Sequence, residues 1–548
     1  MRVACLAAVS ALAAMGQNAS TPEKILSRIE GHIYRADTGA PLGKATLSLE
    51  RLDSQGPGDW LKNYEAVSDG EGAFTLAGIA LGKYRLRASR RGFLDARYGA
   101  KGGSANGAVI DLESPQTLKD VDFRLMAYGV VTGRIVDTDG DPVQGAKVEI
   151  LRSHYVRGKK ALSPDAELNT NDLGEFRGAG LKPGRYFVRA EEFYGVAGLA
   201  TAKEMYVPVF YPGVIDRTGA APVDVTAGAQ IQLGDITLRR APTVKARGKV
   251  VVEIAGTSGR PQVTFERDTG VAGSGSFRMT PGNVGDSGEF EVQNLTPGRY
   301  TAMAQVGKGG VSRVSATVTV DVGAVDLEGI ALRIRDAIVT KAAVRMEGGA
   351  TMNWAGVRWM LRRGGPAGDG SEYEWGSSVA ADGTFQIEEE NPAHYGVFLN
   401  HLPDGYYVKS VRVGESDITY TGFDLGDGPM GTLDILVSRK ASTVAGVVQN
   451  ADGSQAIIGA TVVLAPEAKE RAGIPEYYPV ATSDQFGRFS LKSVPPGDYR
   501  AYAWEEVEAT AWLDPEFMKA FEKDGEALKV EEGGQANVTV KVAQEPRK

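Results

Sequence analysis

The sequence predicts an all-β protein made of five tandem β-sandwich modules, and three observations lead to this fold class. A glycine stands two residues before a phenylalanine in five places, and a tyrosine follows each phenylalanine at ten residues. The segments around these residues alternate between apolar and polar positions over short lengths, as half-buried strands do. Glycine accounts for 70 of the 548 residues, roughly twice its usual share of about 7%, which fits many tight turns. Repetition at a period of about 100 residues indicates one domain-sized unit repeated along the chain.

Each copy of the unit reads as a tight turn, a strand, a second turn and another strand. The glycine before the phenylalanine can adopt a positive φ, and a nearby Asp or Asn can accept backbone hydrogen bonds that close the turn. A Pro-Gly pair, conserved in spacing in three copies, predicts the second turn. The tyrosine then opens a strand whose alternate residues share one face. The five phenylalanine–tyrosine pairs are Phe74 and Tyr84, Phe176 and Tyr186, Phe290 and Tyr300, Phe385 and Tyr395, and Phe489 and Tyr499.

An upstream half repeats as well. In four copies a glycine stands 42 or 43 residues before the phenylalanine and opens a short strand; these residues are Gly31, Gly133, Gly248 and Gly446. Copy four has Ala342 at that place. A polar turn and a second strand follow, and short strands joined by glycine turns are typical of a β-sandwich.

The repeat divides the chain into a signal peptide and five modules. The predicted bounds are 1–16 for the signal peptide, 25–126 for module one, 127–240 for module two, 241–335 for module three, 336–440 for the divergent module four and 441–548 for module five. Module five adds one short helix near 514–524, because Asp514 suits an N-cap and Pro515 suits the first helical position. The links between modules are short, so we expect a semi-rigid string of modules.

The N-terminus favours a secreted protein, or one of the periplasm or cell envelope. Arg2 precedes a small apolar run, and Ala14-Met15-Gly16 is a plausible cleavage site. The alternative is a frayed apolar N-terminus of a cytosolic protein. The run is too short to span a membrane as a helix, and no later run is long and apolar enough. Cys5, the only cysteine, lies in this run, so the predicted mature chain has no disulfide and no cysteine metal site.

The net charge is −8 and the pI is near 5.4. Nucleic-acid-binding domains favour a basic footprint, so this charge argues against nucleic acid as a partner.

The motif order resembles a known family. Gly-x-Val, Gly-Ala-x-Val, Asp-x-x-Gly-x-Phe and Pro-Gly-x-Tyr are similar to the carboxypeptidase regulatory-like domain. That resemblance implies a transthyretin-like, or prealbumin-like, Greek-key β-sandwich grouped with starch-binding-like folds, and a secreted bacterial multi-module protein. It covers nearly all of the predicted mature chain, and modules one, two and five match most closely. It implies an accessory, binding or structural role, sometimes with carbohydrate, and brings no catalytic residues or cofactor.

Three kinds of catalytic or metal chemistry find weak support in the sequence. A zinc peptidase needs clustered His and carboxylate ligands, but none of the four histidines stands in an HExxH pattern. The stretch 137–141 alternates carboxylates as a calcium loop does, yet its glycine falls at the wrong position for such a loop. A turn between two strands accounts for the same acidic residues and glycine without a metal ion. The stretch 273–276 resembles a serine nucleophile elbow but is one residue out of register. We therefore expect no enzyme activity, no cofactor and no metal.

A covalent crosslink between a lysine and a distant Asn or Asp is a further possibility, known from related Gram-positive sandwiches. In modules one and two, the strand after the polar turn begins with Gly-Ala or a similar pair; we call it the Gly-Ala strand. Lys44 and Lys147 lie in these strands and would point outward if Ala45 and Ala146 point inward. The pattern therefore does not indicate a buried lysine.

Aromatic residues are the remaining candidates for ligand binding, because sugars stack on exposed ring faces. The candidates are Trp354, Trp359, Trp375, Tyr373 and His394 in module four, and Tyr206, Phe210 and Tyr211 in module two. Trp354 and Trp359 are an odd number of residues apart, so a regular strand would put them on opposite faces and at least one in the core. Packing in cores and module interfaces is the competing interpretation for all of them. Trp504 is expected to pack on Phe517 and Phe521 of the predicted helix.

Two functions from different classes therefore stay open. The first is a secreted, non-catalytic binding protein whose partner is a polysaccharide or another extracellular ligand, which requires an exposed aromatic patch. The alternative is a structural or scaffold protein that docks protein partners of the cell envelope, which is compatible with buried aromatic residues. An enzyme of another type would require a cleft with convergent ionisable groups.

Overall fold

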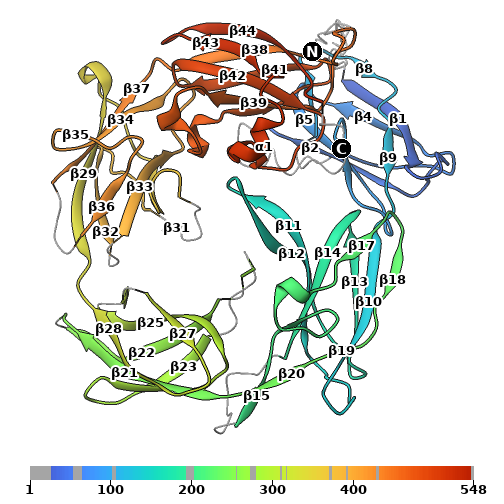
Figure 1. Cartoon of the computed structure of the whole chain (residues 1–548). Helices are drawn as coiled ribbons and strands as arrows, with labels where there is room; N and C mark the ends of the chain where they lie inside the picture. Colours follow the sequence, from blue (N-terminus) through green and yellow to red (C-terminus); the bar gives the residue numbers. More distant parts are fainter. Residues whose placement is uncertain are drawn as a thin grey trace, which may run out of the picture.

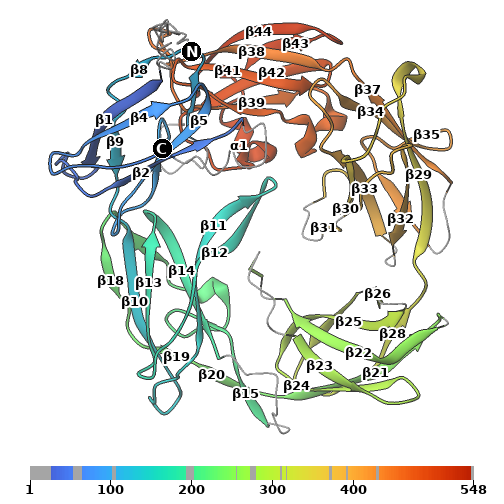
Figure 2. The same ribbon diagram turned by 180° about the vertical axis from the view of Figure 1, so that it is seen from behind.

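The computed structural model describes residues 26–544, except for 54–63, 102–106, 193–202, 255, 269, 272–278, 309–310, 316, 369–372, 375, 390–392 and 427–430. Its secondary structure is almost entirely β, with one short α-helix among the described residues. The modules follow one another around a ring, and the views from the front and from behind agree on this arrangement (Figures 1 and 2).

Every module contains a sheet centred on its first strand. This first strand pairs antiparallel with the strand that carries the repeat phenylalanine and parallel with the closing strand of the module. In chain order the three are β1 (Ser27–Arg35), β4 (Ala73–Ile79) and β9 (Phe123–Leu125) in module one; β10 (Gly129–Val136), β13 (Glu175–Leu181) and β18 (Gln230–Gln232) in module two; β21 (Val244–Val252), β24 (Glu289–Leu295) and β28 (Leu327–Ile334) in module three; β29 (Ile338–Met346), β32 (Thr384–Glu389) and β37 (Leu433–Ser438) in module four; and β38 (Ser442–Gln449), β41 (Arg488–Val494) and β44 (Gln535–Lys541) in module five.

The second sheet pairs the Gly-Ala strand with the tyrosine strand and adds a strand on each side. Its members are β3 (Tyr64–Val67), β2 (Thr46–Arg51), β5 (Gly82–Ser89) and β7 (Val109–Leu112) in module one; β12 (Lys159–Asn169), β11 (Lys147–Val156), β14 (Gly184–Glu191) and β17 (Val223–Val225) in module two; β23 (Met279–Val284), β22 (Thr257–Arg267), β25 (Gly298–Lys308) and β27 (Val318–Val322) in module three; β31 (Tyr373–Glu374), β30 (Arg358–Arg363), β33 (Ala393–Asn400) and β36 (Phe423–Leu425) in module four; and β40 (Val480–Thr482), β39 (Thr461–Pro466), β42 (Gly497–Trp504) and β43 (Glu526–Val530) in module five.

Several shorter or additional strands complete the sheets. They are β6 (Ala96–Arg97), β8 (Thr117–Leu118), β15 (Glu204–Val207), β16 (Val209–Phe210), β19 (Ile236–Thr237), β20 (Arg239–Pro242), β26 (Val311–Val314), β34 (Tyr407–Val413) and β35 (Ser416–Asp417). A buried apolar cluster lies within each module. The predicted tandem array of β-sandwiches is thereby confirmed.

Module three departs from the pattern of two separate sheets. Its strand β23 pairs with β22 on one side and with β24 on the other. In module two the corresponding strand β12 pairs with β11 along its length and is not paired with β13. The two layers of module three are therefore joined into one continuous sheet of eight strands.

The repeat glycine and the repeat phenylalanine lie directly opposite each other in the first sheet. The pairs are Gly31 with Phe74, Gly133 with Phe176, Gly248 with Phe290, Ala342 with Phe385, and Gly446 with Phe489. In three of the glycine copies the phenylalanine ring lies so close that a Cβ on the glycine would stand 2.6–2.8 Å from it. The spacing of 42 or 43 residues in the sequence is therefore the spacing of one cross-strand pair.

The tight turns form as the sequence predicts. The glycine before each phenylalanine has a φ between 73° and 89°. The side chains of Asp69, Asn171, Asp382 and Asp484 each accept a hydrogen bond from a backbone N–H two residues later. These Asx turns explain the acidic or amide residue that precedes the glycine.

The repeat tyrosines are buried and close the turn that precedes them. Their hydroxyls donate to the carbonyl oxygen four residues earlier, at 2.8–3.0 Å, in Tyr84, Tyr186, Tyr300 and Tyr499. An arginine joins this corner in several modules: Arg51, Arg267 and Arg471 donate to the carbonyl oxygens of Leu81, Pro297 and Pro496. The arginine was not predicted, because it comes from a different part of the module: Arg51 and Arg267 lie on β2 and β22, whereas Arg471 lies in a 3-10 turn.

The helix of module five is shorter than predicted. It covers Pro515–Lys519 (α1), and the side chain of Asp514 caps it by accepting from the Glu516 N–H. The chain then continues in turns with hydrogen bonds between residues three apart, such as Phe521 N–H to Met518 O. These tighter turns place the Phe521 ring edge-on against Trp504, with centroids 5.6 Å apart. The predicted packing of Trp504 on Phe517 and Phe521 is confirmed.

Candidate functional site

The aromatic residues proposed from the sequence lie largely in module cores. Trp354 and Trp359 are 3% and 7% exposed and belong to the core of module four, while Tyr206 is 8% exposed and Tyr211 packs partly buried on the core of module two. Trp354, Trp359 and Tyr206 thus present no open ring face. The backbone of Tyr373 belongs to β31, and Trp375 lies outside the described residues.

Trp359 has a structural role that the sequence did not suggest. Its ring stacks on the repeat phenylalanine Phe385, with centroids 5.4 Å apart and an interplanar angle of 23°. Module four is the copy with Ala342 in place of the repeat glycine. The tryptophan therefore helps to hold the phenylalanine ring in the one module that lacks the glycine beneath it.

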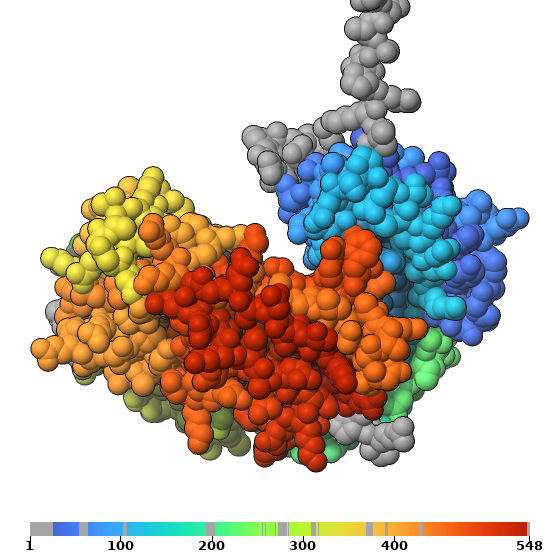
Figure 3. All heavy atoms as spheres, turned by 90° about the horizontal axis from the view of Figure 1, so that it is seen from above, coloured from blue at the N-terminus to red at the C-terminus, as the bar shows by residue number. Residues whose placement is uncertain are grey.

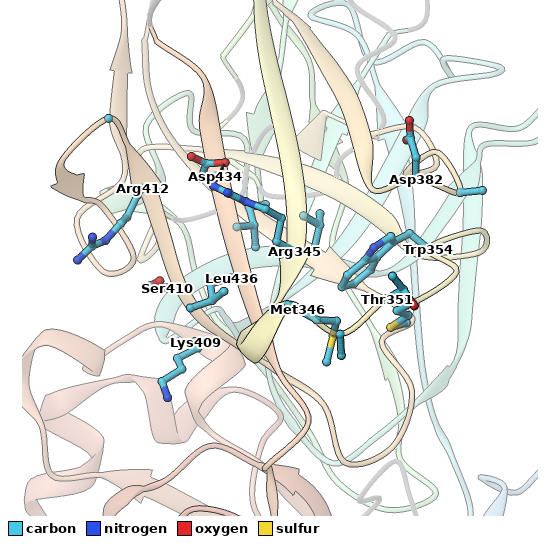
Figure 4. A pocket seen from close by; sticks show the side chains of 17 residues that line it. Arg345, Met346, Thr351, Trp354, Asp382, Lys409, Ser410, Arg412, Asp434 and Leu436 are labelled. Atoms are coloured by element: carbon cyan, nitrogen blue, oxygen red, sulfur yellow. Dashed lines mark ion pairs between the residues drawn. The ribbon is translucent and has the colours of Figure 1, made fainter.

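Trp354 lines a groove on module four. The groove has a volume of about 1160 Å³ and lies beside strands β29, β34 and β37. Met346, Met352 and Trp354 contribute apolar surface, and charged side chains stand around it (Figure 4). Of the residues proposed from the sequence, Trp354 is the one that lines this groove.

An ion pair stands in the groove. Arg345 on β29 reaches Asp434 on β37, with Nη2 and Oδ1 2.5 Å apart, while Arg412 points away from both (Figure 4). Arg345 is well exposed and Asp434 is about one-third exposed. Neither residue carried a sequence signal, because β29 and β37 are parallel neighbours about 90 residues apart in the chain.

At one end of the groove Lys409 leads into the joint between modules four and five. Its Nζ pairs with Glu347 of module four and with Glu532 of module five, the latter at 3.1 Å. The two carboxylates raise the pKa of Lys409 above its usual value, chiefly through these hydrogen bonds. The Tyr407 hydroxyl also donates to Glu532, at 3.3 Å.

A buried arginine fixes the same joint. Arg362 of module four is 1% exposed and binds both carboxylate oxygens of Glu476 in module five. Its guanidinium lies 4.0 Å from the centre of the Phe398 ring. Bidentate pairs of this kind are directional as well as strong, so they fix the orientation of one module on the other.

Module five also contacts module one. The Gln485 side chain accepts from the N–H of Asp111 and donates to the carbonyl oxygen of the same residue, at 3.0 and 2.8 Å. Asp111 lies on β7, so Gln485 occupies backbone groups at a sheet edge. Beside it Gly459 lies so close to Gly99 that a Cβ would stand 2.1 Å from the Gly99 oxygen. Figure 3 shows module five (red and orange) between module four and module one.

The third contact of module five is with module two. The hairpin of β11 and β12 reaches α1 and the segment before it, and the ring of Tyr155 lies 5.8 Å from the ring of Phe517 in α1. With the contacts to modules one and four, this closes the chain on itself. The expected semi-rigid string of modules thus closes into a ring, which was not predicted, because the sequence gives no sign of contacts between modules that are far apart in the chain.

The possible calcium loop is a turn. The Oδ1 atom of Asp137 accepts from the N–H groups of Asp139 and Asp141, at 2.9 and 3.0 Å. Across the described part of the chain, no group of three or more His, Cys, Asp and Glu side chains could hold a metal ion. The stretch 273–276 lies outside the described residues.

Lys147 is more buried than the sequence indicated. Its side chain is 11% exposed and its Nζ lies 2.8 Å from Glu149 and 3.3 Å from Glu167. It points away from the module core, as predicted, but it belongs to a shielded group of charges on the outer face of the sheet. Its neighbours are glutamates rather than the Asn or Asp that the crosslink hypothesis requires.

In the regions that the structure describes, no helix is long and apolar enough to cross a membrane.

Comparison with known proteins supports the fold and leaves the ligand open. Residues 28–126 match the carboxypeptidase regulatory-like domain. No curated protein matches the sequence. Among solved structures, the minor pilin GBS52 of Streptococcus agalactiae is 16% identical, with a TM-score of 0.22, over 39% of this chain and 97% of the pilin. A streptococcal ancillary pilin is 15% identical, with a TM-score of 0.21, over 56% of this chain and 99% of that chain.

The matched segment coincides with the two sheets of module one, from β1 to β9. The same strand order recurs in the modules that follow. The chain is thus a tandem array of β-sandwich modules whose residues 28–126 are a carboxypeptidase regulatory-like domain.

Proposed function

We propose that this protein is a secreted, non-catalytic scaffold of the cell envelope, whose closed frame of modules holds protein partners. The observation that carries the proposal is the position of module five, which contacts modules one, two and four at once. A chain of independent binding modules has no need of such contacts. A frame that must keep its surfaces in fixed relative positions depends on them.

The chemistry of the contacts supports a frame rather than a loose association. They rest on directional groups, such as the buried Arg362 with Glu476 and the paired hydrogen bonds of Gln485. Buried polar groups of this kind are costly when unpaired, so they select one arrangement. The burial of Trp354, Trp359 and Tyr206 fits the same role, since their rings stabilise modules instead of meeting a ligand.

A second candidate function is carbohydrate binding in the groove of module four. Met346 and Met352 line the groove with apolar groups beside the largely buried Trp354, and the pair of Arg345 and Asp434 supplies a donor and an acceptor at the rim. Sugar sites combine apolar contact with a few polar groups that fix orientation. In this candidate Tyr373 and Trp375 stay proposed contacts. For a site on module two, Tyr211 stays a proposed contact, whereas the ring of Tyr206 is buried in the core.

One experiment separates the two functions. The full chain is titrated calorimetrically with a panel of soluble polysaccharides, beside Arg345→Ala and Asp434→Ala. These rim variants are preferred to Trp354→Ala, because removing a buried tryptophan would disturb the core of module four. The matched control is Arg299→Ala, which breaks an exposed pair with Asp321 in module three.

The scaffold proposal expects no saturable binding to any polysaccharide of the panel. Binding that both rim variants lose, and that Arg299→Ala keeps, would replace it with the carbohydrate function. Binding unaffected by the rim variants would contradict the scaffold role and the module-four groove together, and would direct attention to module two.

A further inference from the structure

The contact between modules two and five contains a histidine placed between two carboxylates. His154 lies on β11, near the end of the hairpin that reaches module five. Its Nε2 is 2.7 Å from Oδ1 of Asp165 in module two, and its Nδ1 is 3.1 Å from Oε1 of Glu508 in module five. The same Glu508 oxygen accepts the backbone N–H of Tyr155, at 3.1 Å.

Which of these two contacts is a hydrogen bond depends on the protons that the His154 ring carries. An ionised carboxylate only accepts hydrogen bonds, so a ring nitrogen that bonds to it must carry a proton. A neutral imidazole has one N–H and can satisfy one of the two carboxylates, and its other nitrogen then turns a lone pair toward the second. Only the doubly protonated ring can donate to Asp165 and Glu508 together.

Several charged or titratable groups surround His154, and their positions show which of them contact Asp165 and Glu508. The second oxygen of Asp165 lies 3.1 Å from Nε of Arg152 on β11, in an ion pair, and 3.1 Å from the hydroxyl oxygen of Tyr186 on β14. The Tyr186 hydroxyl is also 2.8 Å from the Lys182 carbonyl oxygen, so its single proton serves one of these two acceptors at a time. Burial raises the pKa of Tyr186, so this hydroxyl stays a donor. Lys160 of β12 lies over the Tyr155 ring, with its Nζ 5.1 Å from the ring centre. Arg152 therefore accompanies Asp165, and Nδ1 of His154 faces Glu508. Arg157 and Lys159 are further cations at the tip of the same hairpin.

Other contacts described at this joint involve no group that titrates near neutral pH. Thr510 Oγ1 donates to the Tyr155 oxygen at 3.3 Å, and the Tyr155 ring meets Phe517 edge-on. Gly158 at the hairpin tip lies against Leu513, where a Cβ would stand 2.8 Å from the leucine Cβ. None of these contacts changes between acidic and mildly alkaline solution, whereas histidine changes its charge in this range.

We propose that protonation of His154 fastens module two to module five, so that this contact of the ring tightens in mild acid and loosens as the pH rises. The direction of the pH effect follows from the number of N–H groups on the His154 ring. In acid both carboxylates are bridged by one cation, and the contact is complete. At higher pH the ring keeps one N–H, Glu508 or Asp165 loses its bond, and the hairpin separates more often from module five. The proposal is independent of which partner the frame holds.

The other histidines with carboxylate neighbours cannot act in the same way, because they contact their own module. His394 bonds to Asp424 and to the Thr421 oxygen inside module four. His32 lies 3.8 Å from Asp122 inside module one. His394 therefore provides a matched control.

The test measures the distance across the joint by double electron–electron resonance. The full chain carries Cys5→Ser, which removes its only cysteine, and spin labels at Val156→Cys and Glu506→Cys. Both positions are exposed and stand on opposite sides of the joint. We expect one narrow distance at about pH 5.5, and at about pH 8 a longer-distance fraction at least about three times larger, since histidine titrates between these values.

Three further variants decide the cause. His154→Gln keeps one donor without a titratable proton, so its distances should be the same at both pH values. Glu508→Gln is exposed enough not to threaten folding and should lose most of the pH response, whereas His394→Gln should keep all of it. Identical distances in the parent at both pH values would overturn the proposal, and so would a full pH response in His154→Gln.

Discussion

At the scale of single residues, the most unusual group is the set of charges on the outer face of module two. Arg189 is 2% exposed, and its two Nη atoms donate to Glu149 at 2.7 Å and to Glu191 at 2.8 Å. Glu149 is fully buried and also receives Lys147. A buried carboxylate is strongly destabilising when its cation is removed, since desolvation is then uncompensated.

Replacing Arg189 with methionine should therefore destabilise module two by about 3–5 kcal/mol. Methionine fills much of the arginine volume, so the loss reports on charge rather than on a cavity. Hydrogen exchange measures the effect, because it resolves one module of a multi-domain chain. The control is Arg185→Met on the same strand, which breaks an exposed pair with Asp224 and should leave the protection of module two nearly unchanged, because water screens exposed pairs. Equal effects of the two variants would contradict the buried-charge interpretation.

At the scale of secondary-structure elements, the pair of glycine and phenylalanine organises each first sheet. In module three a Cβ on Gly248 would stand 2.0 Å from the Ile330 oxygen and 2.6 Å from the Phe290 ring. Ile330 belongs to the parallel closing strand, so the glycine allows both neighbours to approach. In module four, Ala342 takes the place of the glycine, and Trp359 stacks on the ring of Phe385.

Gly248→Ala should therefore destabilise module three by about 1–3 kcal/mol, as overpacking usually does. The measurement is hydrogen-exchange protection of β21, β24 and β28. Gly323→Ala is the control in the same module, because nothing lies within 4 Å of a Cβ there, and a change within about 0.5 kcal/mol is expected. Protection that survives in Gly248→Ala would show that the sheet can widen without loss.

At the scale of the whole molecule, ring closure depends on a few contacts of module five. Gln485 holds module one through both backbone groups of Asp111, while Phe486, the next residue, is 48% exposed. The joint with module four adds the bidentate pair of Arg362 and Glu476. Each end of module five is thus held by directional hydrogen bonds, and losing either end would allow the frame to open.

Gln485→Leu should open the contact between modules one and five. Leucine has about the size of glutamine but cannot bond to the Asp111 N–H and carbonyl. Because these groups would then be unpaired in the contact but hydrated in the open form, separation of the two modules is favoured. Small-angle X-ray scattering should show a larger maximum dimension and radius of gyration than for the parent. Phe486→Ala should leave the scattering unchanged. An unchanged curve for Gln485→Leu would mean that the other contacts suffice for closure.

The sequence by itself determined the repeating unit, because its rules are local or depend on a fixed spacing. The positive φ of the turn glycines, the Asx turns and the pairing of Gly446 with Phe489 all follow from residues that recur at constant intervals. The burial of Tyr499 and the packing of Trp504 on Phe521 follow from the alternation of one strand. Such features need no knowledge of how modules meet.

Only the tertiary structure decided which aromatic residues are accessible and how the modules are arranged. Trp354 and Trp359 carry no local mark that separates a core ring from a ligand platform, and both are buried. Glu508 and His154 are 354 residues apart, and Gln485 and Asp111 are 374 apart. A single polar side chain gives no periodic signal, so contacts of this kind depend on the folded surfaces of whole modules and appear only when these surfaces meet.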